Sequence, residues 1–533
     1  MLPTDQADQV DSCWPPLPSA RRGAGDVPIP SRVALECADD WSNHALDRFS
    51  YLNVRPATGA EELTVRIVRD PALRHEQFRL DVRPGSVDVV AADRAGVGHA
   101  ATVVRQLLPA DAWRRTPVER GSWVLPVVAV DETPAYPWRG FMLDVARHFV
   151  PKQDVLRLVE HLAMHRLNRL HLHLTDDQGW RVESLRHPRL AEVASGRAET
   201  VIGVPGVSEP PSFDGTPHGG YYSVADLREI TAHAARHGIE VVPEIDLPSH
   251  ADALIAALPE LAVPGTAPRP VNPTWGVIGS LISPLPAARA VVAELLAEVA
   301  DAVDSPYLHV GGDEAPLDEW AGSAAVRDYM RASGLASIAE LQSEVYGFLG
   351  RTVEELGRRP VMWDEGFHVH GIPASTIIMA WRAQSHGVGA LRAGHDVVMA
   401  PVDGTYFDYN ESGDDEPLAL GAGQDIEHVA AFTPTIPADV PGALLGVQAQ
   451  LWTEYTPDTR TVAYRTFPRL AVHAANAWTG ESTPWPGRRD ELTTHLARLA
   501  AAGIEYRPLA GPHPWQRGGT GRRKAISPHR VNE

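Results

Sequence analysis

Two acidic residues stand side by side at Asp313 and Glu314, directly after the apolar stretch YLHV and two glycines. In a regular strand, neighbouring side chains point to opposite faces, so adjacent acids rarely serve one site. If the strand ends before them, Gly311 and Gly312 permit backbone angles that turn both carboxylates to the same side. One acid that donates a proton beside another that stays ionised would suit general acid–base catalysis. The alternative is a loop that begins the next helix, because Asp and Glu favour helix N-termini.

Further acids, histidines, arginines and tryptophans follow other short apolar runs of the chain. A carboxylate binds a sugar hydroxyl through a charge-assisted hydrogen bond, and a tryptophan offers a flat apolar face for a sugar ring. Their recurrence at the ends of apolar runs therefore indicates a neutral carbohydrate ligand. The side chains concerned are Asp144, Arg147, His148, Asp176, Asp177, Glu244, Asp246, His250, Trp363, Asp364, Glu365, Trp381, Arg382, Tyr406, Asp408, Trp452 and Glu454.

The elements that must position these side chains begin near Trp138. From there, short apolar runs alternate with helical stretches, of which 151–167 and 286–303 are the clearest, and this rhythm predicts repeated βα units. Eight such units predict a TIM barrel, which would bring the polar residues together at the C-terminal rim of its strands. The expected strands span residues 140–145, 168–174, 239–245, 307–312, 360–365, 376–381, 396–401 and 444–452.

The chain ahead of the barrel predicts a small α+β domain. Apolar and polar residues alternate over 63–67 and 78–82, and the apolar run 87–91 follows a turn over 83–86, as in strands of an antiparallel sheet; residues 96–109 read as a helix. The expected fold class is thus α/β, a (β/α)8 TIM barrel preceded by a small α+β domain. We expect a poorly ordered segment over 1–30, the small domain over 31–134, the barrel over 135–510 and a disordered tail over 511–533.

Bulk properties exclude several classes of protein. The 533 residues carry a formal net charge of −20, which disfavours binding to nucleic acid or to an anionic membrane. No apolar run approaches the ~18 residues of a spanning helix. Cys13 and Cys37 lack the spacing of a zinc site or a disulfide framework, and we expect neither a metal nor a cofactor. Residues 1–30 contain no apolar signal-peptide core, which predicts a cytoplasmic protein, or a secreted one if the start is misassigned.

Five motifs, each at the end of an expected strand, resemble the family 20 glycoside hydrolases, the β-N-acetylhexosaminidases of the bacterial chitobiase and lysosomal hexosaminidase type. The resemblance extends over about residues 35–500 and includes the small domain ahead of the barrel. It implies a retaining, substrate-assisted removal of terminal GlcNAc or GalNAc, in which the substrate's own acetamido oxygen attacks the anomeric carbon. The motifs are WRGFMLDVARHF (138–149), NRLHLHLTDDQGWRVE (168–183), GIEVVPEIDLPSHADA (238–253), YLHVGGDEAP (307–316) and GVQAQLWTEY (446–455).

The resemblance also implies a role for each candidate residue. Glu314 would be the general acid, and Asp313 would stay ionised and orient the acetamido N–H. Tyr406 would hold the acetamido oxygen, while His250 and Asp176 would tune Glu314, with Asp176 favoured over Asp177. The remaining substrate-binding candidates are Arg147, Asp246, Trp363, Trp381, Asp408, Trp452 and Glu454. The implied partner is a small or oligomeric glycoside with a terminal N-acetylhexosamine; the oligomeric state stays open.

Alternative functions remain at this point. A relative that releases a disaccharide such as lacto-N-biose would need a pocket open beyond the hydroxyl-binding end. A non-catalytic sugar-binding protein would not need Asp313, Glu314 and Tyr406 together. The HLHL segment with His171 and His173 could also begin the metal site of an amidohydrolase.

One residue departs from the family's pattern, and two long segments have no assigned role. Ser249 stands where the family more often has glycine, and this difference could alter the conformation of the loop that carries His250. The segments 200–218 and 410–440 are long and acidic, and they could shape the space for the leaving group.

Overall fold

In the computed structural model, which describes residues 7–37, 39–58, 62–116, 123–205, 210–413 and 415–517, eight parallel strands close into a barrel. All eight expected strands form, and the last pairs with the first from Gly446 opposite Trp138 to Leu451 opposite Leu143. The predicted TIM barrel is therefore confirmed. Its strands are β8 (Trp138–Asp144), β9 (Arg169–His173), β14 (Glu240–Glu244), β15 (Tyr307–His309), β16 (Arg359–Trp363), β17 (Ile377–Ala380), β18 (Val397–Met399) and β19 (Leu444–Leu451).

The sequence of the strands fits their position in the wall of the barrel. Every residue of β8 is buried, as expected for a parallel strand covered by side chains on both faces. Helices pack around the strands, and their ends carry the expected signals, such as the capping box of Ser223 and Asp226 at the start of α5. The larger barrel helices are α4 (Lys152–Met164), α5 (Val224–Arg236), α7 (Pro286–Ala302), α10 (Ile338–Glu355), α12 (Gln384–Arg392) and α16 (Arg469–Thr479).

Shorter elements fill the loops, mostly on the rim where the strands end. Two small antiparallel pairs join β10 (Thr175–Asp176) to β11 (Gly179–Trp180) and β12 (Gly196–Arg197) to β13 (His218–Gly219). The additional helices are α6 (Asp252–Ala257), α8 (Asp318–Gly322), α9 (Ala324–Ser333), α11 (Glu365–His368), α13 (Val402–Thr405), α14 (Ile426–Ala431), α15 (Thr459–Thr466) and α17 (Arg489–Ala501).

The N-terminal domain is an α+β unit, as expected, but its seven-stranded sheet is mixed rather than antiparallel. β1, β7, β5 and β6 are antiparallel neighbours, whereas β6, β4, β2 and β3 run parallel. Alternation fixes which face of a strand is buried but not the direction of its partner. The elements are α1 (Ala7–Asp11), β1 (Arg21–Pro28), β2 (Val33–Cys37), α2 (Asp39–Arg48), β3 (Val54–Pro56), β4 (Thr64–Arg69), β5 (Phe78–Arg83), β6 (Ser86–Ala91), α3 (Arg94–Gln106) and β7 (Val124–Glu132).

The prediction of a poorly ordered segment over 1–30 is wrong for residues 7–30. Residues 21–28 form an edge strand of the sheet, and Trp14 is fully buried with its indole N–H donating to the carbonyl of Ala471, 2.6 Å away. These partners lie far along the chain, so the proline-rich composition gave no local sign of them. Of the expected tail, residues 511–517 are described and include a 3-10 turn over Pro514–Gln516, while residues 518–533 lie outside the described residues.

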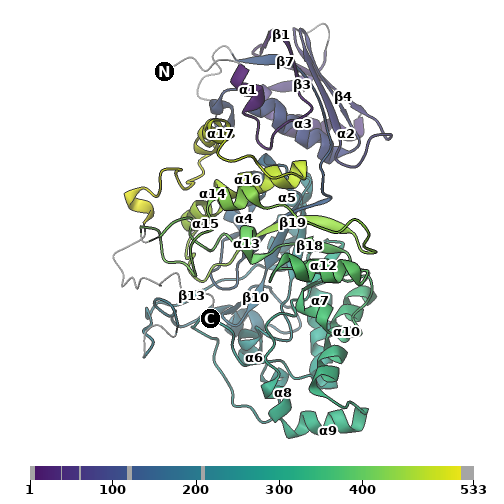
Figure 1. The fold of residues 1–533 in the computed structure, drawn as a ribbon, viewed down its shortest axis with the longest axis vertical. Helices are drawn as coiled ribbons and strands as arrows, with labels where there is room; N and C mark the ends of the chain where they lie inside the picture. Colours follow the sequence, from purple (N-terminus) through teal and green to yellow (C-terminus); the bar gives the residue numbers. More distant parts are fainter. Residues whose placement is uncertain are drawn as a thin grey trace.

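The small domain packs directly on the barrel (Figure 1), with α3 in contact with α4. Trp478 of α16 belongs to the apolar core of the small domain and donates its indole N–H to Glu132 over 2.9 Å. Arg139 of β8 forms a buried ion pair with Glu76 of the small domain at 2.5 Å. Among the described residues, no helix combines the length and apolarity that crossing a membrane requires.

Candidate active site

A pocket of about 260 Å³ lies at the C-terminal ends of the barrel strands. All the residues to which the resemblance gave a role, except Asp176, line this pocket, and Asp176 lies directly behind it in contact with Arg147 and His250. A larger cavity of about 550 Å³ lies between the small domain and the barrel, but its lining lacks this set of acids and aromatic rings. The chemistry therefore singles out the smaller pocket. Its lining is Arg147, Asp246, His250, Asp313, Glu314, Trp363, Trp381, Val402, Tyr406, Asp408, Tyr409, Leu420, Trp452 and Glu454.

The turn after β15 brings both adjacent acids into the pocket. The strand ends at His309, and Gly311 and Gly312 take φ values of 67° and 96°, which are the left-handed conformations that glycine adopts without strain. Glu314 itself has φ 48°. A Cβ on Gly311 would overlap the carboxylate of Asp246, so the close approach also requires glycine. The glycines thus do what the sequence predicted.

Two hydroxyl groups hold this turn in place. Tyr346 donates to the carbonyl of Gly312 over 2.7 Å, and Ser249 donates a short hydrogen bond to the carbonyl of Asp313. Ser249, which departs from the family's usual glycine, therefore ties the loop of His250 to the acid pair. It gives this loop an additional anchor.

His250 connects the acid pair to the acids after β9. Its Nε2 lies 3.5 Å from Glu314 and 3.7 Å from Asp313, while its Nδ1 lies 3.3 Å from Asp176 and 3.4 Å from Asp177. Both aspartates are thus within reach, although Asp176 alone continues the network to Arg147 and His173. Burial by itself would lower the pKa of His250, but the carboxylate of Asp176 raises this pKa well above its usual value.

Burial and neighbouring charges shift the pKa values of the acids around the pocket. Burial raises the pKa of Asp313 to about 6, with the His250 charge opposing and Glu314 adding to the rise. Asp313 is thus ionised at neutral pH but takes a proton in mild acid. Burial and the neighbouring Asp313 raise the pKa of Asp246 well above its usual value. The Oδ1 of Asp246 accepts from the N–H of Gly312 over 3.3 Å.

One end of the pocket collects groups suited to hydroxyls, namely Arg147, Asp408 and Glu454. Arg147 lies 2.7 Å from Asp176 and 3.3 Å from Asp144, and its guanidinium covers the ring of Trp452 at 4.9 Å. Burial together with Glu454 raises the pKa of Asp408 to about 8. Asp408 can therefore donate a hydrogen bond as well as accept one near neutral pH.

Three tryptophans and Tyr406 wall the pocket. Acidic side chains fix two of the indoles, because Trp363 donates to Glu244 over 2.8 Å and Trp381 donates to Glu365 over 2.9 Å. The ring of Tyr406 is 6.5 Å from that of Trp381 and 6.3 Å from that of Trp452. The result is a narrow aromatic slot beside the acid pair.

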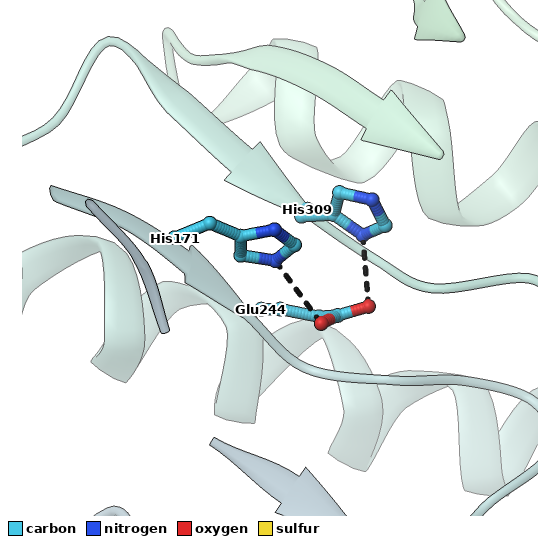
Figure 2. A group of neighbouring side chains, drawn as sticks. All are labelled: His171, Glu244 and His309. Carbon is cyan, nitrogen blue, oxygen red and sulfur yellow. Dashed lines mark ion pairs between the residues drawn. The ribbon is translucent and has the colours of Figure 1, made fainter. Parts of the chain in front are cut away.

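Beneath the pocket, a buried cluster of histidines surrounds Glu244 inside the barrel. His171 of β9 and His309 of β15 approach its carboxylate at 3.0 Å and 3.1 Å (Figure 2). His173 lies 2.5 Å from the same carboxylate through Nδ1 and 2.8 Å from Asp176 through Nε2. Because both nitrogens of His173 face carboxylates, this histidine belongs to a hydrogen-bonded ion network rather than to a metal site.

Some parts of the site were not among the sequence candidates. Tyr409, Leu420 and Val402 also line the pocket from the segment after β18, for which sequence reasoning had named Tyr406, Asp408 and the long acidic loop 410–440. Arg465 and Arg469 hold this loop by donating to the carbonyls of Asp408 and Phe407 and of several neighbours. Glu244 was a candidate as the acid at the end of β14, and His171 and His173 share a face as alternate residues of β9, but the buried contacts between them were not foreseeable.

The structure describes most of the first long loop. In the segment 200–218, residues 206–209 lie outside the described residues, and Asp214 accepts from the backbone of Thr200 over 2.8 Å. Arg197, which precedes the segment, donates to the carbonyl of Arg147 over 2.7 Å. Arg197 also donates to the hydroxyl of Thr200 over 2.8 Å, so it links the start of this loop to the backbone of Arg147.

Comparisons with known proteins find relatives for both domains. The sequence model of the glycosyl hydrolase family 20 catalytic domain matches residues 136–481, and that of the family's domain 2 matches residues 12–130. A beta-hexosaminidase of Porphyromonas gingivalis is 34% identical over 462 residues, which cover 84% of this chain but only 56% of that protein. A beta-N-acetylhexosaminidase of Cellulomonas fimi is 31% identical over 83% of this chain and 82% of its own length.

Solved structures share the fold over nearly the whole chain. A GH20 beta-N-acetylhexosaminidase from Streptomyces coelicolor superimposes with a TM-score of 0.79 at 26% identity, covering 97% of this chain and 100% of that one. A GH20 exo beta-N-acetylglucosaminidase from Vibrio harveyi, in complex with N-acetylglucosamine, gives a TM-score of 0.80 at 27% identity over 94% and 78%. Because the catalytic-domain model matches more than half of the chain and the domain 2 model matches the residues ahead of it, the chain belongs to glycosyl hydrolase family 20.

Proposed function

We propose that this protein is an exo-acting β-N-acetylhexosaminidase that hydrolyses a terminal, non-reducing GlcNAc or GalNAc with retention of configuration. The observation that carries the proposal is that two consecutive acids, Asp313 and Glu314, face one small aromatic-walled pocket. The family and its relatives, a beta-hexosaminidase and a beta-N-acetylhexosaminidase, support this activity.

The adjacency of the acids bears on the mechanism. Most glycosidases place two carboxylates on opposite sides of the scissile bond, with one acting as nucleophile or base. Consecutive residues are poorly placed to flank a bond in that way. The nucleophile is then best supplied by the 2-acetamido oxygen of the substrate, which attacks the anomeric carbon and forms an oxazolinium intermediate.

In this mechanism each acid has its own task. Glu314, whose side chain is 35% exposed, donates its proton to the leaving oxygen and later takes one from water. Asp313, as the anion, accepts a hydrogen bond from the acetamido N–H and stabilises the positive charge that develops there. Tyr406 donates to the acetamido oxygen and holds it near the anomeric carbon, while Trp363, Trp381 and Trp452 enclose the acetamido group and the ring.

The hydroxyl end of the pocket supports exo action on a single sugar. Arg147, Asp408 and Glu454 close that end with polar groups that can bind ring hydroxyls. A volume of about 260 Å³ lies below the ~300–1,000 Å³ of typical small-molecule sites, so a single sugar is a better match than a disaccharide. Release of a disaccharide such as lacto-N-biose is correspondingly disfavoured.

Matched substrates test the proposal. We expect 4-nitrophenyl β-GlcNAc or β-GalNAc to be cleaved and the β-glucoside to be left nearly intact, because only the first two carry the acetamido group. NMR of the first-formed sugar should show the β-anomer. Comparable cleavage of the glucoside, or an α-anomer, would refute substrate assistance. Cleavage of the lacto-N-bioside alone would favour the disaccharide-releasing alternative, and binding without any cleavage would indicate a sugar-binding protein.

A further inference from the structure

A single buried carboxylate, Glu244 at the end of β14, touches two separate parts of the candidate site. Its Oε1 accepts from the indole N–H of Trp363 over 2.8 Å and lies 3.1 Å from Nδ1 of His309. Its Oε2 lies 2.5 Å from Nδ1 of His173 and 3.0 Å from Nε2 of His171. Both oxygens are thus occupied by groups from neighbouring strands (Figure 2).

The protonation states around Glu244 follow from these contacts. Burial would raise the pKa of Glu244, but the imidazoles of His173, His309 and His171 lower this pKa well below its usual value. Burial would lower the pKa of His173, but Glu244 and Asp176 raise it well above. His173 is therefore an imidazolium whose two N–H groups bridge two carboxylates. By contrast, burial lowers the pKa of His171 to about 4, so His171 is neutral.

From Glu244, one path of contacts leads to the acid pair. His173 binds Asp176 at 2.8 Å, and Asp176 in turn lies 2.7 Å from Arg147 and 3.3 Å from His250. His250 lies 3.5 Å from Glu314. The orientation of His250 behind the acid therefore depends, through Asp176 and His173, on a carboxylate that does not line the pocket.

A second path leads to the pocket wall. Trp363 lines the pocket and is fully buried, and Glu244 accepts the hydrogen bond of its indole N–H. The same carboxylate thus fixes the wall on one side and the support of the acid on the other. Such supporting hydrogen bonds orient the groups that act on a ligand.

We propose that Glu244 is a positioning residue of the active site, which sets the orientation of Trp363 and, through His173 and Asp176, that of His250 behind Glu314. The inference rests on the proposed function, since it assigns Glu314 the proton transfer. Glu244 touches no substrate in this role. Its effect is to keep the pocket wall at Trp363 and the acid Glu314 correctly placed relative to each other.

The Glu244→Gln variant tests this role, because the amide keeps the shape but cannot accept from His173 through its NH₂ group. We expect kcat/KM to fall by about 10–100-fold, as is usual when supporting partners of an active group are lost. The loss should be larger for an alkyl β-GlcNAc, whose poor leaving group needs the proton of Glu314, than for 4-nitrophenyl β-GlcNAc. A defect of folding alone would lower both rates equally.

The same strand offers a matched control. Glu240 stands at the other end of β14, half exposed and 3.2 Å from Arg169, so Glu240→Gln makes the same chemical change away from the site. This variant should keep both rates. Should Glu244→Gln fail to fold, Glu244→Asp retains the charge but withdraws it by one methylene group, and its ratio of the two rates should lie between wild type and Gln.

The outcomes separate the two proposals. If wild type cleaves β-GlcNAc substrates but both Glu244 variants keep the wild-type ratio of rates for good and poor leaving groups, the positioning role is refuted and the proposed function stands. If wild type cleaves neither substrate, the proposed function itself fails. A changed ratio in Glu240→Gln would also refute the inference, because the effect would not be specific to Glu244.

Discussion

Asp313 is the residue whose protonation state should set the response of the enzyme to acid. Burial raises the pKa of its carboxyl group to about 6, and substrate assistance needs the anion. As pH falls through about 6, Asp313 takes up a proton and can no longer stabilise the positive charge on the acetamido group. We therefore expect kcat/KM to decline towards acid with an apparent pKa near 6, measured from rates in the free-enzyme regime.

The variant Asp313→Asn checks that assignment. It should lower kcat by about 10²–10³-fold, the loss expected when an electrostatic contact to the transition state is removed. Binding of the sugar should weaken much less. Its residual activity should lose the decline near pH 6. If the decline persists in the variant, another group sets it, and Asp177, whose pKa burial also raises to about 6, is the next candidate.

At the scale of elements, the turn after β15 makes the adjacency of the two acids productive. A Cβ on Gly311 would overlap the Asp246 carboxylate and come 2.8 Å from its Cα, and φ is 67°. We expect Gly311→Ala to abolish most activity by displacing Asp313 and Glu314, and to lower the free energy of unfolding by about 1–3 kcal/mol. Rates and urea unfolding measure the two effects.

Gly334 provides the control for that substitution. It ends α9 with φ 72°, and an added Cβ would meet nothing within 4 Å. Gly334→Ala therefore imposes the same backbone strain without the collision, and it should cost about 1 kcal/mol while leaving activity intact. Equal activity of the two variants would show that the close approach at Gly311 does not position the acids.

Which features the sequence predicts depends on how far apart along the chain the interacting residues lie. The eight barrel strands were predictable because each is a short apolar run between helical segments, and a barrel places their ends on one rim. That is why residues as distant as Arg147 and Glu454 could be assigned to one pocket. The ladder partner of β1 was not predictable, since β1 pairs with β7 about a hundred residues away and its composition resembles a linker.

The candidate site shows the same division. Residue types at strand ends indicated the acids and aromatic rings, but they did not reveal that burial would raise the pKa of Asp313 and Asp408. Those shifts depend on the number of neighbouring side chains, which no local pattern encodes. Leu420 and Tyr409 were missed for a similar reason, because Arg465 and Arg469 from distant helices hold their loop against the pocket.

At the scale of the whole molecule, the small domain and the barrel share buried charges. Glu76 lies 2.5 Å from Arg139, with side-chain exposures of 3% and 0%, and also accepts from Asn168 over 3.0 Å. Burial would raise the pKa of Glu76, but Arg139 and His99 lower it below its usual value. Its contribution to stability is therefore fully present above the pKa of the unfolded chain and is lost only as pH falls through the lower folded pKa.

Removing one partner of this pair should loosen the junction of the two domains. Glu76→Gln leaves Arg139 buried without its counter-charge, so we expect the free energy of unfolding at pH 7 to fall by about 3–5 kcal/mol. The exposed pair of Arg79 and Asp131, at 3.0 Å within the small domain, supplies the control, and Asp131→Asn should cost at most about 1 kcal/mol. Chemical unfolding, followed by tryptophan fluorescence, measures both. Similar losses in the two variants would mean that the domains do not depend on the buried pair, and that the apolar contacts around Trp478 hold them together instead.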